Sequence, residues 1–238
     1  MKIAILGYGK MGVMIEQIAL IKGHEIVCKL GSLSAESEWS KLAKADVAIE
    51  FSNPISAFNN ISKCFDANVP VVVGTTGWYD QYEAVKLRCI NENQAIITAT
   101  NFSIGVNLFF HVNKIIARVM ENLPEYDVKI EEIHHTHKLD SPSGTAITIA
   151  EGVLSEMTRK KEWKLAADVT SEADLLINSI RTDEVPGTHT ITYSSKIDDI
   201  ELKHTAHSRT GFATGAVLAA EWLQNKRGAF TMNDFIGF

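Results

Sequence analysis

Cysteine is scarce in this chain, and long hydrophobic runs are missing. Three cysteines, Cys28, Cys64 and Cys89, are spread over 238 residues, and no Cys-x-x-Cys pair occurs. Their odd number and wide spacing exclude a disulfide framework and a thiolate zinc site, and they favour a reducing cytoplasm. No run approaches the roughly 18 apolar residues of a membrane helix, and the few apolar residues before Gly7 are too short for a signal-peptide core. We therefore expect a cytoplasmic protein with no membrane partner.

Positive charge is also in short supply. The chain has 23 Lys and Arg against 29 Asp and Glu, which gives a net charge of −6 at pH 7. Nucleic-acid binding depends on clustered Lys and Arg, so we expect no nucleic-acid partner. An anionic ligand would need a local group of positive side chains. Apolar residues at 45% and charged residues at 22% are ordinary for a globular protein, and 238 residues allow one or two domains.

Short apolar runs alternate with helical patterns over the first hundred residues. The predicted strands are Ile3–Leu6, Glu25–Cys28, Val47–Ile49, Val69–Val73 and Ala95–Thr98. The predicted helices are Lys10–Lys22, Ser34–Lys44, a stretch beginning at Pro54, and Tyr79–Asn91. Strand and helix alternating at this rhythm predict an α/β fold, a Rossmann-like doubly wound parallel sheet covered on both faces.

The pattern changes in the second half of the chain, where strands follow one another without helices between them. A helix over Val106–Met120, a strand over Val128–Ile133 and a helix over Thr145–Met157 come first. The strand-like runs Leu176–Arg181, His189–Ser194 and Ile200–Thr205 come next. They predict a second, α+β domain with a mixed, mostly open sheet of four strands. The last helix, Thr214–Asn225, resembles those of the first domain. We expect residues 1–103 and 208–238 to form a dinucleotide-binding domain, and 104–207 a substrate-binding and oligomerisation domain.

A glycine motif follows the first predicted strand. It reads Gly7-Tyr8-Gly9-Lys10-Met11-Gly12 and opens a predicted helix. In this context G-x-G-x-x-G is typical of a loop that approaches a dinucleotide pyrophosphate, with the helix N-terminus facing the phosphates. The spacing of a P-loop is absent. The alternative is a glycine-rich turn that binds nothing.

The acidic residue that usually follows the second strand of such a domain is missing. The sequence there reads Cys28-Lys29-Leu30-Gly31-Ser32. A carboxylate would bond the ribose of NAD and repel a 2′-phosphate, whereas Lys29 and Ser32 could accept that phosphate. A merely solvated Lys29 is an equally good interpretation. We expect NADPH to be accepted at least as well as NADH.

Two further polar segments follow predicted strands. One is Gly74-Thr75-Thr76-Gly77-Trp78, and the other is Ala99-Thr100-Asn101-Phe102-Ser103. Ligands of open parallel sheets bind beyond the carboxyl ends of the strands, so both segments could ring one crevice. The alternative for each is an ordinary strand–helix turn with a hydroxyl as the helix cap.

The third motif, from His134 to Thr145, concentrates the histidines of the chain. It reads His134-His135-Thr136-His137-Lys138-Leu139-Asp140-Ser141-Pro142-Ser143-Gly144-Thr145. It supplies the local positive charge that an anionic substrate needs. Metal binding is an alternative that Lys138 opposes, because it is a cation and only Asp140 adds a carboxylate. We expect no metal.

The end of this motif begins a predicted helix. The hydroxyls of Ser143 and Thr145, with the N–H groups of the first turn, could form a cradle for a carboxylate. A helix cap and nothing more is an alternative for Ser143 alone. His134 or Lys138 could donate the proton that completes a hydride reduction, but four extended residues span ~13 Å. The chain must bend between them if both are to contact one small substrate.

Together these motifs resemble the 4-hydroxy-tetrahydrodipicolinate reductase family, long called dihydrodipicolinate reductases. The resemblance also includes Asn101-Phe102-Ser103-x-Gly105-Val106-Asn107, Arg181, Pro186-Gly187-Thr188-His189 and His204-x-Ala206-x-x-Arg209-x-x-Phe212. The match spans nearly the whole chain in the same order, and the segment from His134 to Thr145 is its most specific part. The first glycine loop is one residue shorter than the common form of the family.

The resemblance implies an enzyme of the diaminopimelate route to lysine. It would use NADPH or NADH to reduce 4-hydroxy-tetrahydrodipicolinate to tetrahydrodipicolinate with loss of water, and would form a homotetramer. His134 would be the acid/base and Lys138 the proton donor. The cyclic dicarboxylate would be held by His135, Lys138, Ser143, Gly144 and Thr145. The dinucleotide would be lined by Gly7, Tyr8, Gly9, Lys10, Met11, Gly12, Gly74, Thr75, Thr76, Ala99, Thr100, Asn101 and Phe102.

Two other functions are compatible with parts of the sequence. Another two-domain dehydrogenase would keep residues 1–103 but gives no reason for the segment from His134 to Thr145. A non-catalytic dinucleotide sensor would need the glycine loop, but neither Lys138 nor the carboxylate cradle.

Overall fold

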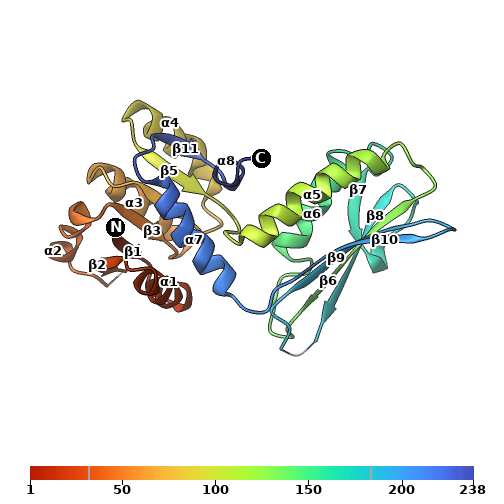
Figure 1. Cartoon of the computed structure of the whole chain (residues 1–238), viewed down its shortest axis with the longest axis horizontal. Helices are drawn as coiled ribbons and strands as arrows, with labels where there is room; N and C mark the ends of the chain where they lie inside the picture. Colours follow the sequence, from red (N-terminus) through yellow and green to blue (C-terminus); the bar gives the residue numbers. More distant parts are fainter. Residues whose placement is uncertain (32, 183) are drawn as a thin grey trace. The chain divides into compact units, whose positions relative to one another are not determined.

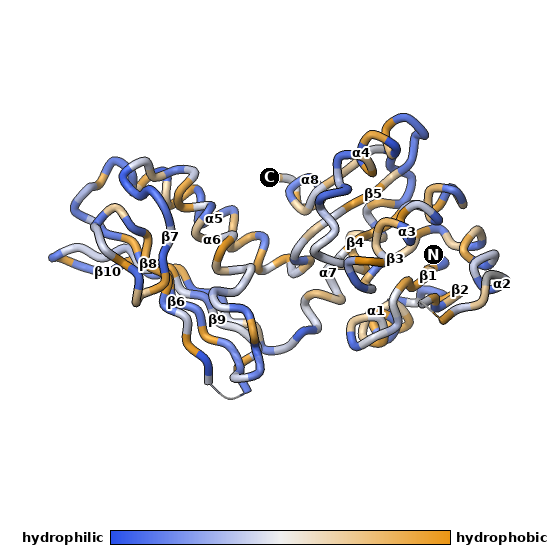
Figure 2. Tube along the Cα trace, turned by 180° about the vertical axis from the view of Figure 1, so that it is seen from behind, coloured by the Kyte–Doolittle hydropathy of each residue, from blue (hydrophilic) through white to orange (hydrophobic). Residues whose placement is uncertain are grey.

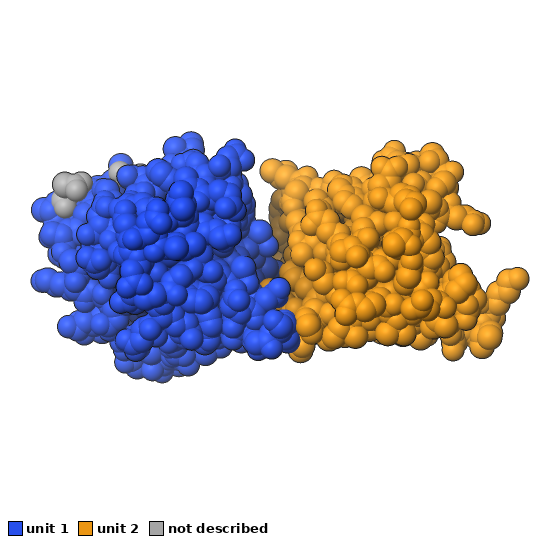
Figure 3. Space-filling view, turned by 90° about the horizontal axis from the view of Figure 1, so that it is seen from above, with its two compact units in different colours: residues 1–104, 210–238 blue, residues 105–209 orange. Residues whose placement is uncertain are grey.

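The computed structural model describes residues 1–31, 33–182 and 184–238. These residues form two compact units, which are coloured separately in Figure 3. The first consists of Met1–Ile104 with Thr210–Phe238, and the second of Gly105–Arg209. No helix in the described part of the chain is both long and apolar enough to cross a membrane.

The first unit is built on a six-stranded parallel sheet with the order β11-β5-β4-β3-β1-β2. Its strands are β1 Lys2–Leu6, β2 Glu25–Leu30, β3 Val47–Glu50, β4 Val71–Val73, β5 Ala95–Thr98 and β11 Gly228–Phe230. Its helices are α1 Lys10–Ile21, α2 Glu36–Trp39, α3 Pro54–Asp66, α4 Tyr82–Asn91, α7 Thr210–Leu223 and α8 Met232–Ile236, with 3₁₀ turns η1 Leu42–Lys44 and η2 Tyr79–Gln81. The predicted Rossmann-like sheet is confirmed.

Helices cover both faces of this sheet. Alternate residues of a strand point to opposite sides, and here both sets are apolar, so each face needs a covering layer. Ile3 and Ile5 of β1 lie in a core with α1, α7 and α8. Ala4 and Leu6 lie in a second core with α3 and α4. The strands are therefore apolar on both faces, and β3 is drawn in the hydrophobic colour in Figure 2. Buried parallel strands require this composition.

The structure differs from the predicted elements of the first unit at several places. The helix expected over Tyr79–Asn91 is η2 followed by α4, the one expected over Thr214–Asn225 is α7, and α8 was not predicted. The single helix expected over Ser34–Lys44 is instead α2 and η1, and the Ser40 hydroxyl between them donates to the Ser37 carbonyl at 2.7 Å. Serine bonds of this kind compete with helix formation. Strand β4 starts at Val71 because Pro70 lacks the N–H that a central strand needs. Strand β11 was not predicted, since three residues give no periodicity.

The second unit is a five-stranded mixed sheet with the order β10-β9-β6-β8-β7. Strands β6, β8 and β7 run parallel, while β9 is antiparallel to both β6 and β10. Its elements are α5 Ile104–Met120, β6 Asp127–His134, α6 Gly144–Leu154, β7 Glu162–Leu165, the 3₁₀ turn η3 Ala166–Asp168, β8 Asp174–Arg181, β9 Thr188–Ser194 and β10 Asp199–Thr205. The predicted mixed sheet is confirmed, with β7 added to the four expected strands.

Strand β6 is central to this sheet and positions the site. Figure 1 shows α5 and α6 beside the sheet, and both share its core with Val128 and Ile130. The next two residues on the same face of β6 are Glu132 and His134, and they are also buried. One face of β6 therefore changes from apolar to charged toward its carboxyl end.

Candidate active site

The glycine loop of the first unit is shaped by close backbone contacts. Gly7 has a φ of +92°, and a Cβ there would come under 3.0 Å from the backbone of Phe51 and Ser52. A Cβ at Gly12 would similarly collide with the carbonyl of Gly7. Position 9 is different, because a Cβ there would have no atom within 4 Å. Two glycines are thus required by the fold, and the open side of the loop lies at Gly9.

The loop lies where the sheet topology creates a crevice. Strand β1 pairs with β2 on one side and with β3 on the other. The order in which the strands join the sheet therefore reverses at β1, and such a switch point leaves a crevice at the carboxyl end of the strand. Helix α1 begins here with Gly9 as its N-cap and no side-chain cap. Its first N–H groups and positive dipole end are suited to phosphate. These residues fit a dinucleotide.

A hollow of about 370 Å³ joins the first two predicted motifs. Its lining includes Gly9, Lys10 and Met11 from one motif, and Gly74, Thr75 and Thr76 from the other, together with Phe51, Ser52 and Pro54. A Cβ at Gly74 would collide with the Phe51 ring. The Thr75 hydroxyl accepts a hydrogen bond from the Ser52 N–H at 2.8 Å, which fixes the two strand ends together.

A neighbouring hollow of about 480 Å³ extends from Gly7, Tyr8 and Gly9 to Gly31, at the end of β2, and to α3. Lys29 is not among its described lining residues. The Lys29 ammonium lies 2.6 Å from the Glu16 carboxylate and 3.2 Å from the Tyr8 hydroxyl. Ser32, the other residue expected at a 2′-phosphate, lies outside the described residues.

The segment from Ala99 to Phe102 lies away from the hollows that the glycine motif and the segment from Gly74 to Thr76 line. Among the described residues, neither hollow is lined by Ala99, Thr100, Asn101 or Phe102. Phe102 is 1% exposed and belongs to the core, where its ring lies 5.9 Å from that of Phe51. The Asn101 side chain accepts from the Ser103 N–H at 2.9 Å. A cofactor contact by this segment stays a prediction.

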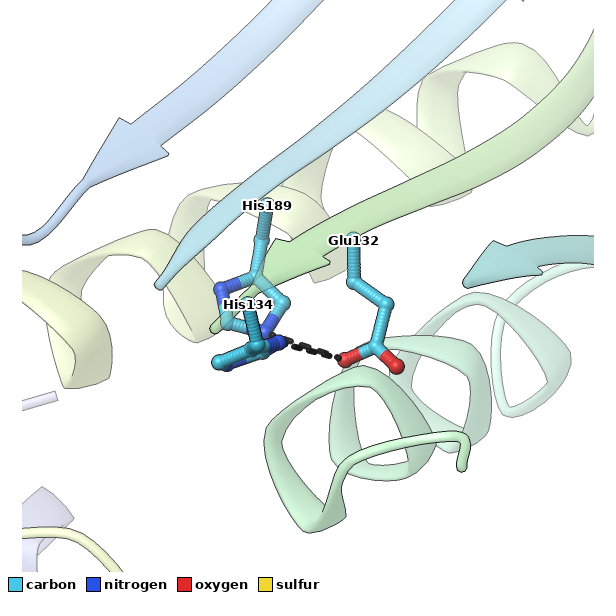
Figure 4. A group of neighbouring side chains, drawn as sticks. All are labelled: Glu132, His134 and His189. Atoms are coloured by element: carbon cyan, nitrogen blue, oxygen red, sulfur yellow. Dashed lines mark ion pairs between the residues drawn. The ribbon is translucent and has the colours of Figure 1, made fainter. Parts of the chain in front are cut away.

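In the second unit, three side chains converge at the carboxyl end of β6. Figure 4 shows Glu132 and His134 of β6 with His189, which lies opposite Glu132 on β9. The Glu132 Oε2 lies 3.2 Å from His134 Nδ1 and 3.8 Å from His189 Nε2. The two rings meet edge to face with centroids 5.0 Å apart. All three residues are buried.

The other carboxylate oxygen of Glu132 is fully hydrogen-bonded. Oε1 accepts from the Ser143 N–H at 3.0 Å, the Ser179 hydroxyl at 2.8 Å and the Arg181 guanidinium at 3.0 Å. Burial favours a raised pKa for Glu132, but the bonds from His134 and these three donors outweigh it and hold the pKa well below its usual range. Glu132 is therefore ionised although it has no exposed surface.

The histidines have different surroundings. Burial, together with the neighbouring His134, lowers the pKa of His189 to about 3, so this ring is neutral at physiological pH. His134 has its Nδ1 toward Glu132, and a Cβ at Gly187 would lie 3.0 Å from its Nε2. Glycine at position 187 lets the backbone approach this nitrogen closely. One nitrogen of His134 thus faces the carboxylate, while the other faces Gly187.

The polar loop after β6 returns to this cluster at Ser143. The Ser143 hydroxyl caps α6 by accepting from the Ala146 N–H at 3.1 Å, and it lies 3.3 Å from His189 Nε2. Lys138 lies in the loop, with its ammonium 2.7 and 2.9 Å from the two carboxylate oxygens of Asp140. The Gly144 N–H also bonds that carboxylate. A carboxylate of this chain therefore contacts both Lys138 and the start of α6.

A metal at this cluster is the main alternative. One ligand atom from each of Glu132, His134 and His189 lies within 4.8 Å of the others. However, Arg181 already neutralises Glu132, and a guanidinium 3.0 Å from a ligand carboxylate repels a cation. We interpret the group as a hydrogen-bonded charge cluster.

Family models account for nearly all of the chain. Residues 1–102 match the N-terminal part of dihydrodipicolinate reductase, and residues 105–236 match its C-terminal part. The chain belongs to the dihydrodipicolinate reductase family. Similar members include the 4-hydroxy-tetrahydrodipicolinate reductases of Christiangramia forsetii, which is 51% identical over 99% of this chain and 98% of its own, and of Neisseria gonorrhoeae, 34% identical over 93% and 84%.

Solved structures of reductases and dehydrogenases share the fold. A dihydrodipicolinate reductase from Paenisporosarcina sp. TG-14, determined with dipicolinate, has a TM-score of 0.81 at 23% identity and covers 99% of this chain and 98% of its own. An engineered D-amino acid dehydrogenase bound to NADP⁺ has a TM-score of 0.53 at 15% identity, over 97% and 92%.

Glu132 belongs to none of the motifs recognised in the sequence. Its signal was present, because the inward positions of β6 read Val128, Ile130, Glu132 and His134. A carboxylate in an otherwise apolar period-two pattern indicates a buried charge that needs partners.

Proposed function

We propose that the chain reduces 4-hydroxy-tetrahydrodipicolinate to tetrahydrodipicolinate, with consumption of NADPH or NADH and loss of water, on the diaminopimelate route to lysine. The observation that carries this proposal is the pairing of two sites in one chain. One is a glycine cradle for a dinucleotide, and the other is a buried histidine–glutamate cluster beside a lysine and a helix N-terminus. The names of the relatives support the same reaction.

The first unit is the dinucleotide-binding part of this proposal. Gly7 and Gly12 shape the loop, Gly9 leaves it open, and the N-terminus of α1 receives the pyrophosphate. A bound dihydronicotinamide supplies the hydride. Tyr8, Lys10, Met11, Gly74, Thr75 and Thr76 line the same hollows. NADPH is expected to be accepted at least as well as NADH.

The second unit binds the dicarboxylate and manages protons. Elimination of water takes up one proton at the leaving hydroxyl and releases one from the neighbouring carbon. Hydride addition then leaves an electron-rich centre that takes up one proton, so the reaction consumes one proton overall. Lys138 is the proposed proton donor. The Glu132 carboxylate lies 3.2 Å from His134 Nδ1, so Nε2 is the nitrogen proposed to exchange a proton with the substrate.

A substrate carboxylate would take the place of Asp140. That side chain now accepts from Lys138 and from the Gly144 N–H. The same donors, with Thr145 and His135, form the proposed carboxylate site. The Ser143 hydroxyl contributes by capping α6 and so holding these N–H groups in position.

We also propose a homo-oligomer joined through the sheet of the second unit, a tetramer on family resemblance. Helices α5 and α6 contribute to the core on one face of this sheet. The opposite face carries Leu176 and Ile180 of β8, both partly exposed. Static light scattering at micromolar concentration should give a multiple of the 26.3 kDa chain mass. A monomer would contradict the proposal.

A turnover assay tests the proposed reaction. The substrate is made in situ by the synthase of the preceding step, and NADPH absorbance is followed. Loss of absorbance only when the synthase and its substrates are present supports the reductase. Turnover with amino acids or sugars alone would instead indicate another dehydrogenase. Dinucleotide binding without any turnover would indicate a sensor.

A further inference from the structure

A buried carboxyl group connects three segments of the first unit. Glu50 is the last residue of β3 and is 0% exposed. Its Oε1 accepts hydrogen bonds from the Ser52 hydroxyl and from Asn60 Nδ2, the latter at 3.2 Å. The Ser52 N–H in turn donates to the Thr75 hydroxyl at 2.8 Å. This network joins the end of β3 to helix α3 and to the loop after β4.

The network fixes the orientation of the Asn60 amide. Asn60 Nδ2 donates to Glu50 Oε1 and also to the Ser52 hydroxyl oxygen, at 3.1 Å, so both of its N–H groups have acceptors. An amide turned the other way would place its oxygen against Glu50 Oε1, and two acceptors in contact repel each other. The NH₂ group therefore faces Glu50, and the carbonyl oxygen of Asn60 faces away from it.

Asn60 lines the 480 Å³ hollow together with Gly7 and Gly9 of the glycine loop and with Gly31, directly after β2. In doubly wound sheets the adenosine ribose lies at the end of the second strand, where an acidic residue accepts a hydrogen bond from a ribose hydroxyl. The sequence from Cys28 to Ser32 contains no acidic residue. A ribose hydroxyl in this hollow therefore needs an acceptor from another element.

We propose that the side-chain oxygen of Asn60 accepts a hydrogen bond from a hydroxyl of the adenosine ribose, and that Glu50 is the positioning residue that orients it. The inference rests on the proposed function and deepens its cofactor site. An amide oxygen is uncharged, so it does not repel a 2′-phosphate as a carboxylate would. This property fits a site that accepts NADPH as well as NADH.

The direct test uses two ligands that differ only in the ribose hydroxyls. 5′-ADP and 2′,3′-dideoxy-5′-ADP both carry the pyrophosphate, and each is titrated into the full-length protein by calorimetry. The parent should bind ADP about 3- to 10-fold more tightly, the range of one neutral hydrogen bond. Asn60→Leu removes the acceptor at similar volume and should bind the two ligands alike.

Variants of Glu50 test its positioning role. Glu50→Leu should also lose the preference for ADP, because the Asn60 amide is no longer held. Glu50→Gln keeps an acceptor oxygen and should restore the preference. The double variant Glu50→Leu/Asn60→Leu should bind ADP as Asn60→Leu does, within about twofold, because Glu50 acts through Asn60. Losses that simply add would contradict the positioning role.

The matched control is Asn59→Leu, which removes the same amide from the preceding residue of α3. Asn59 is exposed and also lines the hollow. It should leave the preference for ADP unchanged, because the amide that Glu50 orients is that of Asn60. A preference lost in Asn59→Leu and kept in Asn60→Leu would overturn the assignment.

Turnover with NADH separates this inference from the proposed function. For Asn60→Leu, KM for NADH should rise about 3- to 10-fold while kcat stays within about twofold, because the contact is remote from the reacting atoms. A parent that binds the two ADP ligands alike would overturn the inference while the reductase activity stands. No turnover by the parent with either cofactor would overturn the proposed function instead.

Discussion

Among the side chains that the structure describes, each unit buries one glutamate completely, and the two glutamates behave in opposite ways. Glu50 in the first unit and Glu132 in the second are both 0% exposed. Burial raises the pKa of Glu50, because the hydrogen bonds that it accepts from Ser52 and Asn60 do not offset the loss of water. Burial also favours a raised pKa for Glu132, but the bonds from His134, Ser143, Ser179 and Arg181 outweigh it and hold that pKa low. The balance between burial and the donors around each carboxylate decides the direction of its pKa shift.

The contrast extends to how the two sites are built. The first unit offers backbone, in the form of glycines and the N-terminus of α1. The second offers charged side chains held by one another. Substitutions that add volume should therefore impair the glycine site more than substitutions that change charge. In the charge cluster, substitutions that change charge should have the larger effect.

The largest expected effect is that of Lys138→Ala. It removes a charge-assisted contact and a proton donor, so kcat/KM for the dicarboxylate should fall roughly a thousandfold or more. NADPH affinity, measured by fluorescence titration, should stay within a few-fold. Lys196→Ala, an exposed lysine between β9 and β10, is the control. Equal losses of NADPH binding and turnover would disprove the division of labour between the units.

Glu132→Gln and Glu50→Gln test the contrast between the glutamates. The first leaves Arg181 without its buried partner and should lower the free energy of unfolding by about 3–5 kcal/mol. The second removes a poorly compensated carboxyl and should change it by less than about 1 kcal/mol at pH 7.5. Urea denaturation measures both.

Glu131→Gln is the control on β6, because this residue lies on the other face and bonds Asn178. It should cost about 1 kcal/mol or less. Similar losses for all three variants would show that Glu132 has no special partners.

Gly12→Ala and Gly9→Ala separate fold from ligand binding in the first unit. At position 12 the new methyl meets the Gly7 carbonyl, so stability should fall by about 1–3 kcal/mol. At position 9 the methyl enters open space. There stability should be kept, while NADPH affinity falls by roughly tenfold because the loop no longer approaches the pyrophosphate. Weakened binding without destabilisation in Gly12→Ala would contradict this account.

The last expected effect is absent at neutral pH, and it is a dependence of stability on pH at His189. Its pKa falls from 6.5 to about 3 on folding, so the unfolded chain binds more protons between these values. Its stabilising contribution is complete above pH 6.5 and declines by about 1.4 kcal/mol per unit as the pH falls. Glu132 adds a loss in the same direction only below about its ordinary value of 4.5.

His189→Asn should therefore flatten the profile between pH 6.5 and 4.5, as measured by urea denaturation at half-unit intervals. An unchanged slope would show that His189 is not the group that titrates.

Much of the fold could be predicted because its signals are local. The alternation of apolar runs and helices gave the parallel sheet, and the position of Gly7 after a strand indicated the phosphate loop. Strands β7 and β11 were not predicted, because runs of four and three residues are too short to show the alternation of apolar and polar residues that marks a strand. The cluster around Glu132 needs residues from β6, β8, β9 and the start of α6, which only the folded sheet brings together.

Strand β6 carries both hydrophobic core residues and the buried charge cluster on a single face. Because side chains alternate along a strand, a slip of one residue would turn Val128 and Ile130 to solvent together with Glu132 and His134. Burial of the hydrophobic residues therefore also fixes the side of the sheet on which Glu132 and His134 lie. A second sheet in the wrong register would lose its hydrophobic core and its charge cluster together, so forms that keep one without the other should be rare.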